Sequence, residues 1–285
     1  MEFTVLRRAN QSTERGDQPP ELEPGVFMRP SDSAVRLTRH DGAWSRSAGP
    51  FPARELVAGF TLVQAASRAD VIEQVRWWPL FDAGAIYEIR AAVGEGAGIG
   101  LRSEAAAESD FAAAPTPDAN ADAGAGAIRK PDLTRYLVFL RADADAEAGL
   151  MPAPAALDRM HAYEQASVQA GALLAGASLA ATRTATRVRF ANANTSLVAG
   201  PFAEVKELVA GYWIVQAATL DDAIAWAVAY PYPQADQVTV EIREVCERRE
   251  QREFTAEMRA AEERLRAEAL EGVLREAMAR RKRAL

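Results

Sequence analysis

Residues 48–67 read AGPFPARELVAGFTLVQAAS, and residues 199–219 read AGPFAEVKELVAGYWIVQAAT. The two stretches share the tetrapeptide Ala-Gly-Pro-Phe, followed by a tail in which Glu-Leu-Val-Ala-Gly and Val-Gln-Ala-Ala recur in the same order. Chance does not produce a match of this length, so the sequence predicts two copies of one structural unit. The first copy is one residue shorter after its phenylalanine.

Each tail predicts a strand that leads into a short amphipathic helix. A capping residue, Ser67 or Thr219, is followed three residues later by Asp70 or Asp222. This pattern opens a helix, because the hydroxyl and the carboxylate both satisfy free backbone N–H groups. A last strand then follows in each copy, over residues 85–90 and 238–244.

The second copy also has a complete front part, with a predicted strand over residues 135–140 and a predicted helix over residues 155–171. The order β-α-β-β-α-β is ferredoxin-like, with one antiparallel sheet and two helices on one face. The first copy has an opening strand over residues 2–7, but three prolines within residues 18–25 exclude a regular helix there. We therefore expect an α+β fold whose first unit lacks one covering helix.

These features divide the chain into four segments. Residues 1–93 form a degenerate repeat, residues 94–132 an Ala-, Gly-, Asp- and Pro-rich linker, and residues 133–246 a complete repeat. Residues 247–285 are dense in Glu and Arg with a sparse apolar stripe, which predicts one long charged helix. That helix either packs on the body or on its copy as a solvated element, or offers a surface to a protein partner.

The composition limits the classes of function that the chain can have. A chain of 285 residues with 49% hydrophobic residues can bury a sizeable core, and its net charge of −7 argues against direct nucleic-acid binding. Cys246 is the single cysteine and there are two histidines, so the sequence predicts neither an intrachain disulfide nor a four-ligand Cys/His zinc site. No signal-peptide pattern or membrane span is recognisable. We expect a cytoplasmic protein without metal, cofactor or membrane contact.

The second copy resembles the YCII-related family, in the subgroup known for its D-G-P-F motif. The resemblance covers residues 133–245, and in the first copy it covers residues 25–93. It is carried by four stretches of the second copy, which read AGALLAG at residues 170–176, ATRVRF at 185–190, GPFAEVKE at 200–207 and AGYWI at 210–214.

The resemblance implies a dimeric α/β-barrel, in which two ferredoxin-like units set their sheets against each other and enclose a cleft. Because two units share this chain, we expect an intrachain pseudo-dimer whose halves are joined by residues 94–132. The family resemblance also implies a bacterial protein, and a link to transcription regulation, because members often lie beside genes for sigma factors.

Where the wider superfamily has been assigned chemistry, the resemblance implies a lyase or dehalogenase reaction that uses a His and an Asp in the cleft. Ala48 and Ala199 stand where the subgroup's motif opens with that Asp, and alanine can neither take a proton nor accept a hydrogen bond. Residues 176–179 read GASL where the subgroup reads G-E-G-L, so a second carboxylate is missing. The family's usual acid chemistry is therefore expected to be lost or relocated.

The remaining candidates for chemistry each have a structural alternative. His161 is the candidate catalytic base, although its helix has an ordinary amphipathic pattern. Charged residues after the motif fit either a cleft or a surface salt bridge, and the aromatic ones fit either a flat ligand or the core. The cleft candidates are Gly49, Pro50, Phe51, Glu55, Gly200, Pro201, Phe202, Lys206, Glu207, Tyr212 and Trp213.

Two functions follow from these observations. The leading hypothesis is a non-catalytic binding or regulatory module that takes a small-molecule ligand in the cleft or a protein partner through residues 247–285. The alternative is an enzyme that acts on a small, aromatic molecule with His161 in place of the lost acid. The two hypotheses differ in whether His161 reaches an enclosed cleft with another titratable group.

Overall fold

The computed structural model describes residues 1–15, 25–78, 84–93, 128–191, 194–202, 208–233 and 237–246. We refer to residues 1–93 as the first half and to residues 128–246 as the second half. Several sequence predictions lie outside the described residues, namely the helix over residues 247–285, the linker up to residue 127, the proline-rich stretch before Gly25, and the candidates Lys206 and Glu207.

The first half is a strand-rich unit with short helices. Its elements are β1 (Glu2–Arg8), α1 (Gln11–Glu14), β2 (Val26–Met28), η1 (Ser31–Ser33), β3 (Val35–His40), β4 (Ala43–Ala48), η2 (Ala53–Glu55), β5 (Val57–Gln64), α2 (Arg68–Val75) and β6 (Ile86–Val93).

The described elements of the second half follow a similar order and include a longer helix. Its elements are β7 (Thr134–Arg141), α4 (Ala144–Ala148), α5 (Pro154–Gln169), β8 (Leu173–Leu179), η3 (Thr182–Thr184), β9 (Thr186–Ala191), β10 (Asn194–Ala199), β11 (Val209–Ala217), α6 (Leu220–Ala229) and β12 (Gln237–Cys246).

The predicted helix starts are confirmed at α2 and α6. Ser67 and Thr219 each accept a hydrogen bond from the backbone N–H of Asp70 and Asp222, and each aspartate accepts one back from the capping residue. The reciprocal bonds satisfy backbone donors that a helix start otherwise leaves open. They therefore set where each helix begins.

Eight of the described strands close into a barrel. The hydrogen-bonded order runs β1-β5-β2-β12-β7-β11-β8-β6, and β6 pairs in turn with β1. Two hairpins extend this ring, because β3 continues from β12 and carries β4, whereas β9 continues from β6 and carries β10. Each hairpin therefore pairs with the last strand of the other half.

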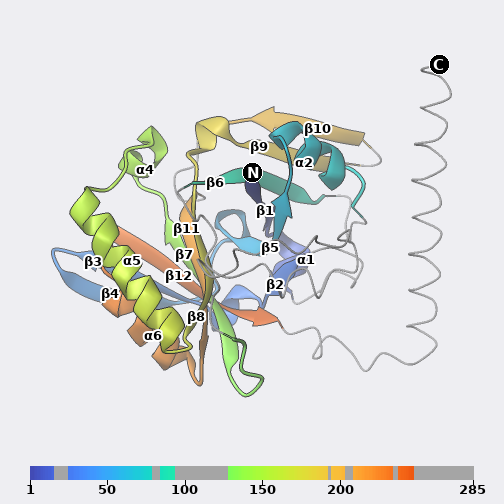
Figure 1. Ribbon diagram of the computed structural model, residues 1–285. Helices are drawn as coiled ribbons and strands as arrows, with labels where there is room; N and C mark the ends of the chain where they lie inside the picture. The colour runs from blue at the N-terminus through green and yellow to red at the C-terminus, as the bar shows by residue number, and fades with distance from the viewer. Residues whose placement is uncertain are drawn as a thin grey trace.

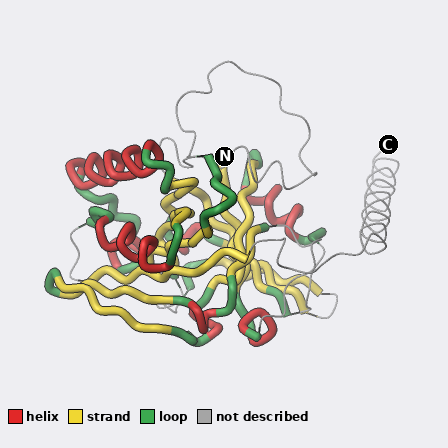
Figure 2. Tube along the Cα trace, turned by 90° about the horizontal axis from the view of Figure 1, so that it is seen from below, coloured by secondary structure: helices red, strands yellow, loops and turns green. Residues whose placement is uncertain are grey.

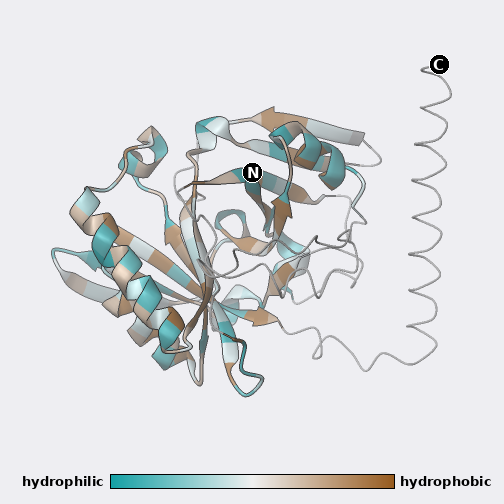
Figure 3. Ribbon diagram, in the orientation of Figure 1, coloured by the Kyte–Doolittle hydropathy of each residue, from teal (hydrophilic) through white to brown (hydrophobic). Residues whose placement is uncertain are grey.

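Helices cover the barrel from outside. Figure 1 shows α5 and α6 together on one side and α2 on the opposite side, and Figure 2 shows the same arrangement from below. Hydrophilic and hydrophobic residues are mixed along α5, as expected for a helix with one buried face (Figure 3). None of the helices in the described ranges is long and apolar enough to cross a membrane.

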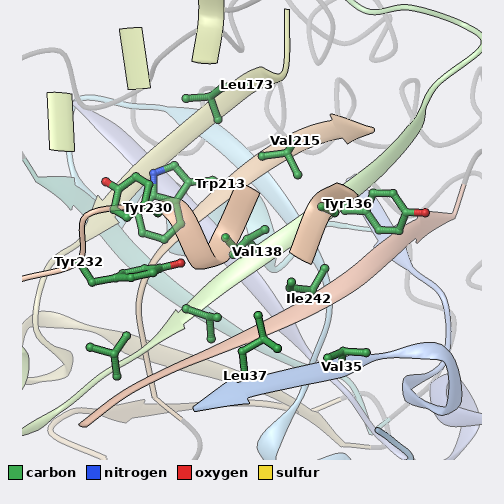
Figure 4. Packing of buried hydrophobic residues seen from close by; sticks show 14 of the residues in the cluster. Val35, Leu37, Tyr136, Val138, Leu173, Trp213, Val215, Tyr230, Tyr232 and Ile242 are labelled. Atoms are coloured by element: carbon green, nitrogen blue, oxygen red, sulfur yellow. The ribbon is translucent and has the colours of Figure 1, made fainter. Parts of the chain in front are cut away.

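Two hydrophobic cores lie between the helices and the barrel wall. Under α5 and α6, Met160, Ala223 and Ala227 belong to one buried cluster with strand residues such as Trp213 and Val240. Figure 4 shows Trp213 of this cluster beside Tyr230. Under α2, a smaller core surrounds Val71 and Val75, with members Phe3, Val5, Val63, Ala85, Tyr87, Ile89 and Val188. Each helix thus buries one stripe against the sheet beneath it.

A third core fills the inside of the barrel. Leu6, Phe60, Phe139, Tyr212 and Val245 belong to one buried cluster although they come from five different strands of the ring. Side chains from strands all around a closed ring can meet only in its interior. The cleft that the family resemblance implied between the sheets is therefore filled by apolar side chains in the described part of the barrel.

Close backbone contacts hold the Gly-Pro-Phe turns. A Cβ atom added at Gly49 would lie 1.6 Å from the carbonyl oxygen of Ser31, and one added at Gly200 would lie 1.7 Å from that of Thr182. Only glycine allows the two backbones to approach this closely. The repeated glycine of the motif thus has a packing role in each half.

We expect the variant Gly49→Ala to lower the free energy of unfolding by about 1–3 kcal/mol, because the added methyl group meets backbone that must shift. Ser47→Ala, on the exposed strand β4, is the control and should change it by less than about 0.5 kcal/mol. Urea unfolding at neutral pH measures both variants. Equal stabilities of Gly49→Ala and wild type would contradict the packing role.

Candidate functional site

The two Gly-Pro-Phe turns are built in the same way. Each has a cis peptide bond before its proline, at Gly49-Pro50 and at Gly200-Pro201. The N–H of Phe51 donates to the Ser31 hydroxyl at 3.0 Å, and the N–H of Phe202 donates to the Thr182 hydroxyl at 3.4 Å. Each turn is thereby fastened to the 3-10 turn that precedes its own hairpin.

A buried carboxylate lies beneath the first turn. Glu241 on β12 has no exposed surface, and its Oε2 accepts a hydrogen bond from Nε of Arg36 at 2.8 Å and another from Arg141. Arg243 lies 3.7 Å from the other oxygen. We call Glu241 and these three arginines the Glu241 cluster. Arg36 also donates to Glu55 at 2.7 Å, which attaches η2 to this cluster.

The same arrangement recurs beneath the second turn. Glu88 on β6 is 1% exposed, and it accepts hydrogen bonds from Arg90 and Arg187, both at 2.9 Å. The positive charge of Arg8 also acts on this carboxylate. We call Glu88 and its three arginines the Glu88 cluster. In each cluster, the glutamate and one arginine belong to different halves of the chain.

The arginines decide the charge state of both glutamates. Burial alone raises the pKa of Glu241, but the charges of Arg141, Arg243 and Arg36 outweigh it and hold the pKa below its ordinary value. The pKa of Glu88 is likewise lowered, since its arginine partners outweigh the effect of burial. Both carboxylates are therefore ionised at neutral pH and unsuited to proton transfer there.

Each cluster also holds the phenylalanine of its turn. The guanidinium group of Arg36 lies 4.1 Å from the ring centre of Phe51, and that of Arg187 lies 3.9 Å from the ring centre of Phe202. A cation over an aromatic face is attracted by the ring's electron density. One arginine thus joins the turn of its own hairpin to the last strand of the other half.

A surface pocket of about 330 Å³ adjoins the first turn. Its wall includes the Phe51 ring and charged side chains of both signs, Glu14, Arg15 and Asp32, and it is completed by Gln11, Pro50 and Ala53. Glu14 is held in place, because it accepts hydrogen bonds from the backbone N–H of Ser31 at 2.9 Å and from Arg243 at 3.2 Å. The pocket is thus connected to the Glu241 cluster through Glu14.

The structure separates the other predicted candidates. His161 is exposed on α5, and Ala48 and Ala199 are exposed at the hairpin ends. Tyr212 points into the barrel, where its ring lies 5.4 Å from that of Phe60. Trp213 points the other way, into the core under the helices, and donates to Glu164 at 2.8 Å.

Sequence reasoning missed the two arginine clusters, although a signal for them was present. The tripeptide Glu-Ile-Arg occurs at residues 88–90 and at residues 241–243, in the last strand of each half. In a strand, the Glu and the Arg share one face, and the Ile faces the opposite side. Two opposite charges on one face of a strand with mostly buried residues indicate a buried ion pair, because a lone buried charge is strongly disfavoured.

We expect Glu241→Gln to lower the free energy of unfolding by about 3–5 kcal/mol, because it leaves buried arginines without their counter-charge. The matched control is Glu244→Gln on the same strand. Glu244 pairs with Arg29 at 2.7 Å, and both side chains are partly exposed. The loss for Glu244→Gln should be below about 1 kcal/mol. Chemical denaturation measures both. Similar losses in the two variants would show that the Glu241 cluster is not a special stabilising element.

The clusters also predict how stability depends on pH. Because the pKa values of Glu88 and Glu241 are lower in the folded than in the unfolded chain, their contribution is complete above the unfolded value of about 4.3. It is lost as the pH falls through the folded values. Unfolding free energies between neutral pH and pH ~3 should therefore fall more steeply for wild type than for Glu241→Gln, and parallel curves would contradict this.

The comparisons with known proteins bear on the second half. Residues 134–249 match the family described as "YCII-related domain". An uncharacterized protein of Rhizobium meliloti (strain 1021) is 35% identical over 68 residues, which are 24% of this chain and 55% of that protein. The chain thus spans about half the length of the curated relative that it matches. The match confirms the resemblance of the second half to the YCII-related family over these residues.

Proposed function

We propose that the chain is an intrachain pseudo-dimer of two YCII-like units of the D-G-P-F subgroup, and that it acts as a non-catalytic binding module. The observation that carries this proposal is the use of Glu88 and Glu241 in ion pairs between the halves. A carboxylate held by three arginines contributes to assembly and is not available as an acid or a base at neutral pH.

The strand pairings support the pseudo-dimer. β1 pairs with β5 and β6 as β7 pairs with β11 and β12. Between the halves, β2 and β3 pair with β12 as β8 and β9 pair with β6. Exchanging the two halves therefore maps the pairings of one onto those of the other, which is the pattern of an isologous two-fold interface.

The position of His161 supports the non-catalytic hypothesis over the enzyme. A general base must lie within hydrogen-bond reach of the proton that it removes, at a site that excludes water. His161 is exposed on α5, whereas the Gly-Pro-Phe turns lie at the ends of the hairpins. Ala48 and Ala199 provide no replacement carboxylate at either turn.

The pocket beside Phe51 is our candidate ligand site. The aromatic residue Phe51 in its lining suits a flat apolar group, and the lining residues Arg15 and Asp32 carry opposite charges. These features fit a small molecule that bears both an apolar ring and polar groups of opposite charge. A regulatory role and a link to transcription rest on the family resemblance.

The pseudo-dimer predicts that neither half is stable alone. A chain of residues 132–246 lacks β1, β2, β5 and β6, so the apolar interior side of its remaining strands is exposed to water. We expect this fragment to aggregate or to self-associate, and to become soluble and monodisperse when residues 1–93 are co-expressed. Light scattering measures the outcome. A stable monomeric fragment would refute the pseudo-dimer and leave the ligand proposal untouched.

The binding proposal predicts that a small molecule is retained by the Phe51 pocket. Native mass spectrometry of the full chain purified from its host should detect it, and Phe51→Ala should lose it, because the aromatic wall is removed. Phe202→Ala, the corresponding change at the other turn, is the matched control and should keep it. His161→Gln should also keep it. If the retained molecule is converted by wild type and no longer by a folded His161→Gln variant, the protein is an enzyme and the proposal is wrong.

A further inference from the structure

Two strands of the described part lie at the ends of the hydrogen-bonded network. β4 pairs only with β3, and β10 pairs only with β9, among the strands that the structure describes. The outer edge of such a strand presents backbone N–H and C=O groups that can pair with another chain. The two strands occupy equivalent positions in the two halves, but only β4 carries a charged side chain.

A charged side chain protects the edge of β4 against pairing with another strand. Arg46 extends from β4 and forms an ion pair with Asp221 at the start of α6, at 3.2 Å. Trp44 turns inward, and its ring packs edge-on against Tyr232 at 5.9 Å. A charge on an edge strand discourages pairing with a further strand, because the approaching chain would have to desolvate it. Arg46 on β4 therefore disfavours the addition of a further strand at this edge.

The described residues provide no such charge at the edge of β10. Residues 194–199 read NTSLVA and include no charged residue and no proline. Leu197 occupies the position that corresponds to Arg46, because it lies opposite Val188 as Arg46 lies opposite Leu37. Leu197 is 45% exposed and its neighbour Val198 is 37% exposed. Since neighbouring strand residues point to opposite faces, apolar surface is exposed on both faces of this edge.

We propose that two copies of the chain associate through antiparallel pairing of their β10 strands. A strand can pair with its own copy about a two-fold axis, so the same edge serves both partners. No like charges meet across the junction, because residues 194–199 are uncharged. With the axis at Leu197, the two Leu197 side chains lie opposite each other and Val198 lies opposite Ser196 of the partner, which covers the exposed apolar groups.

The difference between the two edges predicts a closed dimer. Growth into a fibre needs a second open edge on each molecule, and β4 is the corresponding edge. Because Arg46 guards β4, pairing at β10 uses the open edge and ends there. The interface is small, so we expect a concentration-dependent dimer of modest affinity.

Sedimentation velocity of the full chain over a range of concentrations tests the proposal. We expect a monomer–dimer equilibrium for wild type and at least about a tenfold weaker dimer for Val198→Lys and for Leu197→Lys, because each places a charge at the junction. The matched control is Ser47→Lys on β4, at the position that corresponds to Val198. It should dimerise as wild type does.

Folding of each variant is checked by its thermal unfolding transition, since these side chains are exposed and their replacement should leave it close to wild type. A second measurement places the contact. In a Cys246→Ser background, Leu197→Cys should form a disulfide-linked dimer under oxidising conditions, because residues opposite each other across the axis lie within disulfide reach. A wild type that stays monomeric, or a dimer that folded Val198→Lys and Leu197→Lys leave unchanged, would overturn the proposal.

Discussion

The structure depends on two buried carboxylates, one supplied by each half to the hairpin of the other. Glu241, on the last strand of the second half, lies opposite Arg36 of the first hairpin, and Glu88 lies opposite Arg187 of the second hairpin. A shift of either hairpin by one residue would turn its arginine to the other face and leave a buried charge unpaired. The ion pairs therefore select the register in which the halves combine. An apolar pair could supply similar stability but would not discriminate between registers in this way.

The same clusters join segments that lie far apart in the sequence. The hairpins pair with strands about 200 residues away in one case and about 100 residues away in the other, since β3 meets β12 and β9 meets β6. The cost of closing a loop grows only slowly with its length, so such pairings are accessible when the contacts formed are strong. Charged side chains in a dry environment provide contacts of this kind, and apolar side chains fill the barrel between them.

Much of this fold could be predicted from the sequence, and the part that could not has a physical cause. Ser67 and Thr219 mark their helices correctly, because capping is a local interaction. The exchange of hairpins was not predicted, since strand partners far apart in sequence leave no local trace. The predicted candidates Tyr212 and Trp213 are neighbours in a strand, so one faces the barrel interior and the other faces the helices. The repeated Glu-Ile-Arg was the signal that would have located the buried charges.

Among the described residues, the halves differ in the length of the helix that follows their first strand. In the second half, Trp213 is covered by α5 and donates to Glu164 of that helix. The matching position of the first half is Thr61, and the described helix that follows β1 is the four-residue α1. A tryptophan at that position would need a long helix above it, because so large a side chain is costly to leave in water. The smaller residue therefore accompanies the shorter helix. Where α1 ends, Glu14 and Arg15 line the pocket beside Phe51, so the surface that we propose for ligand binding arises at the place where the first half departs from the second.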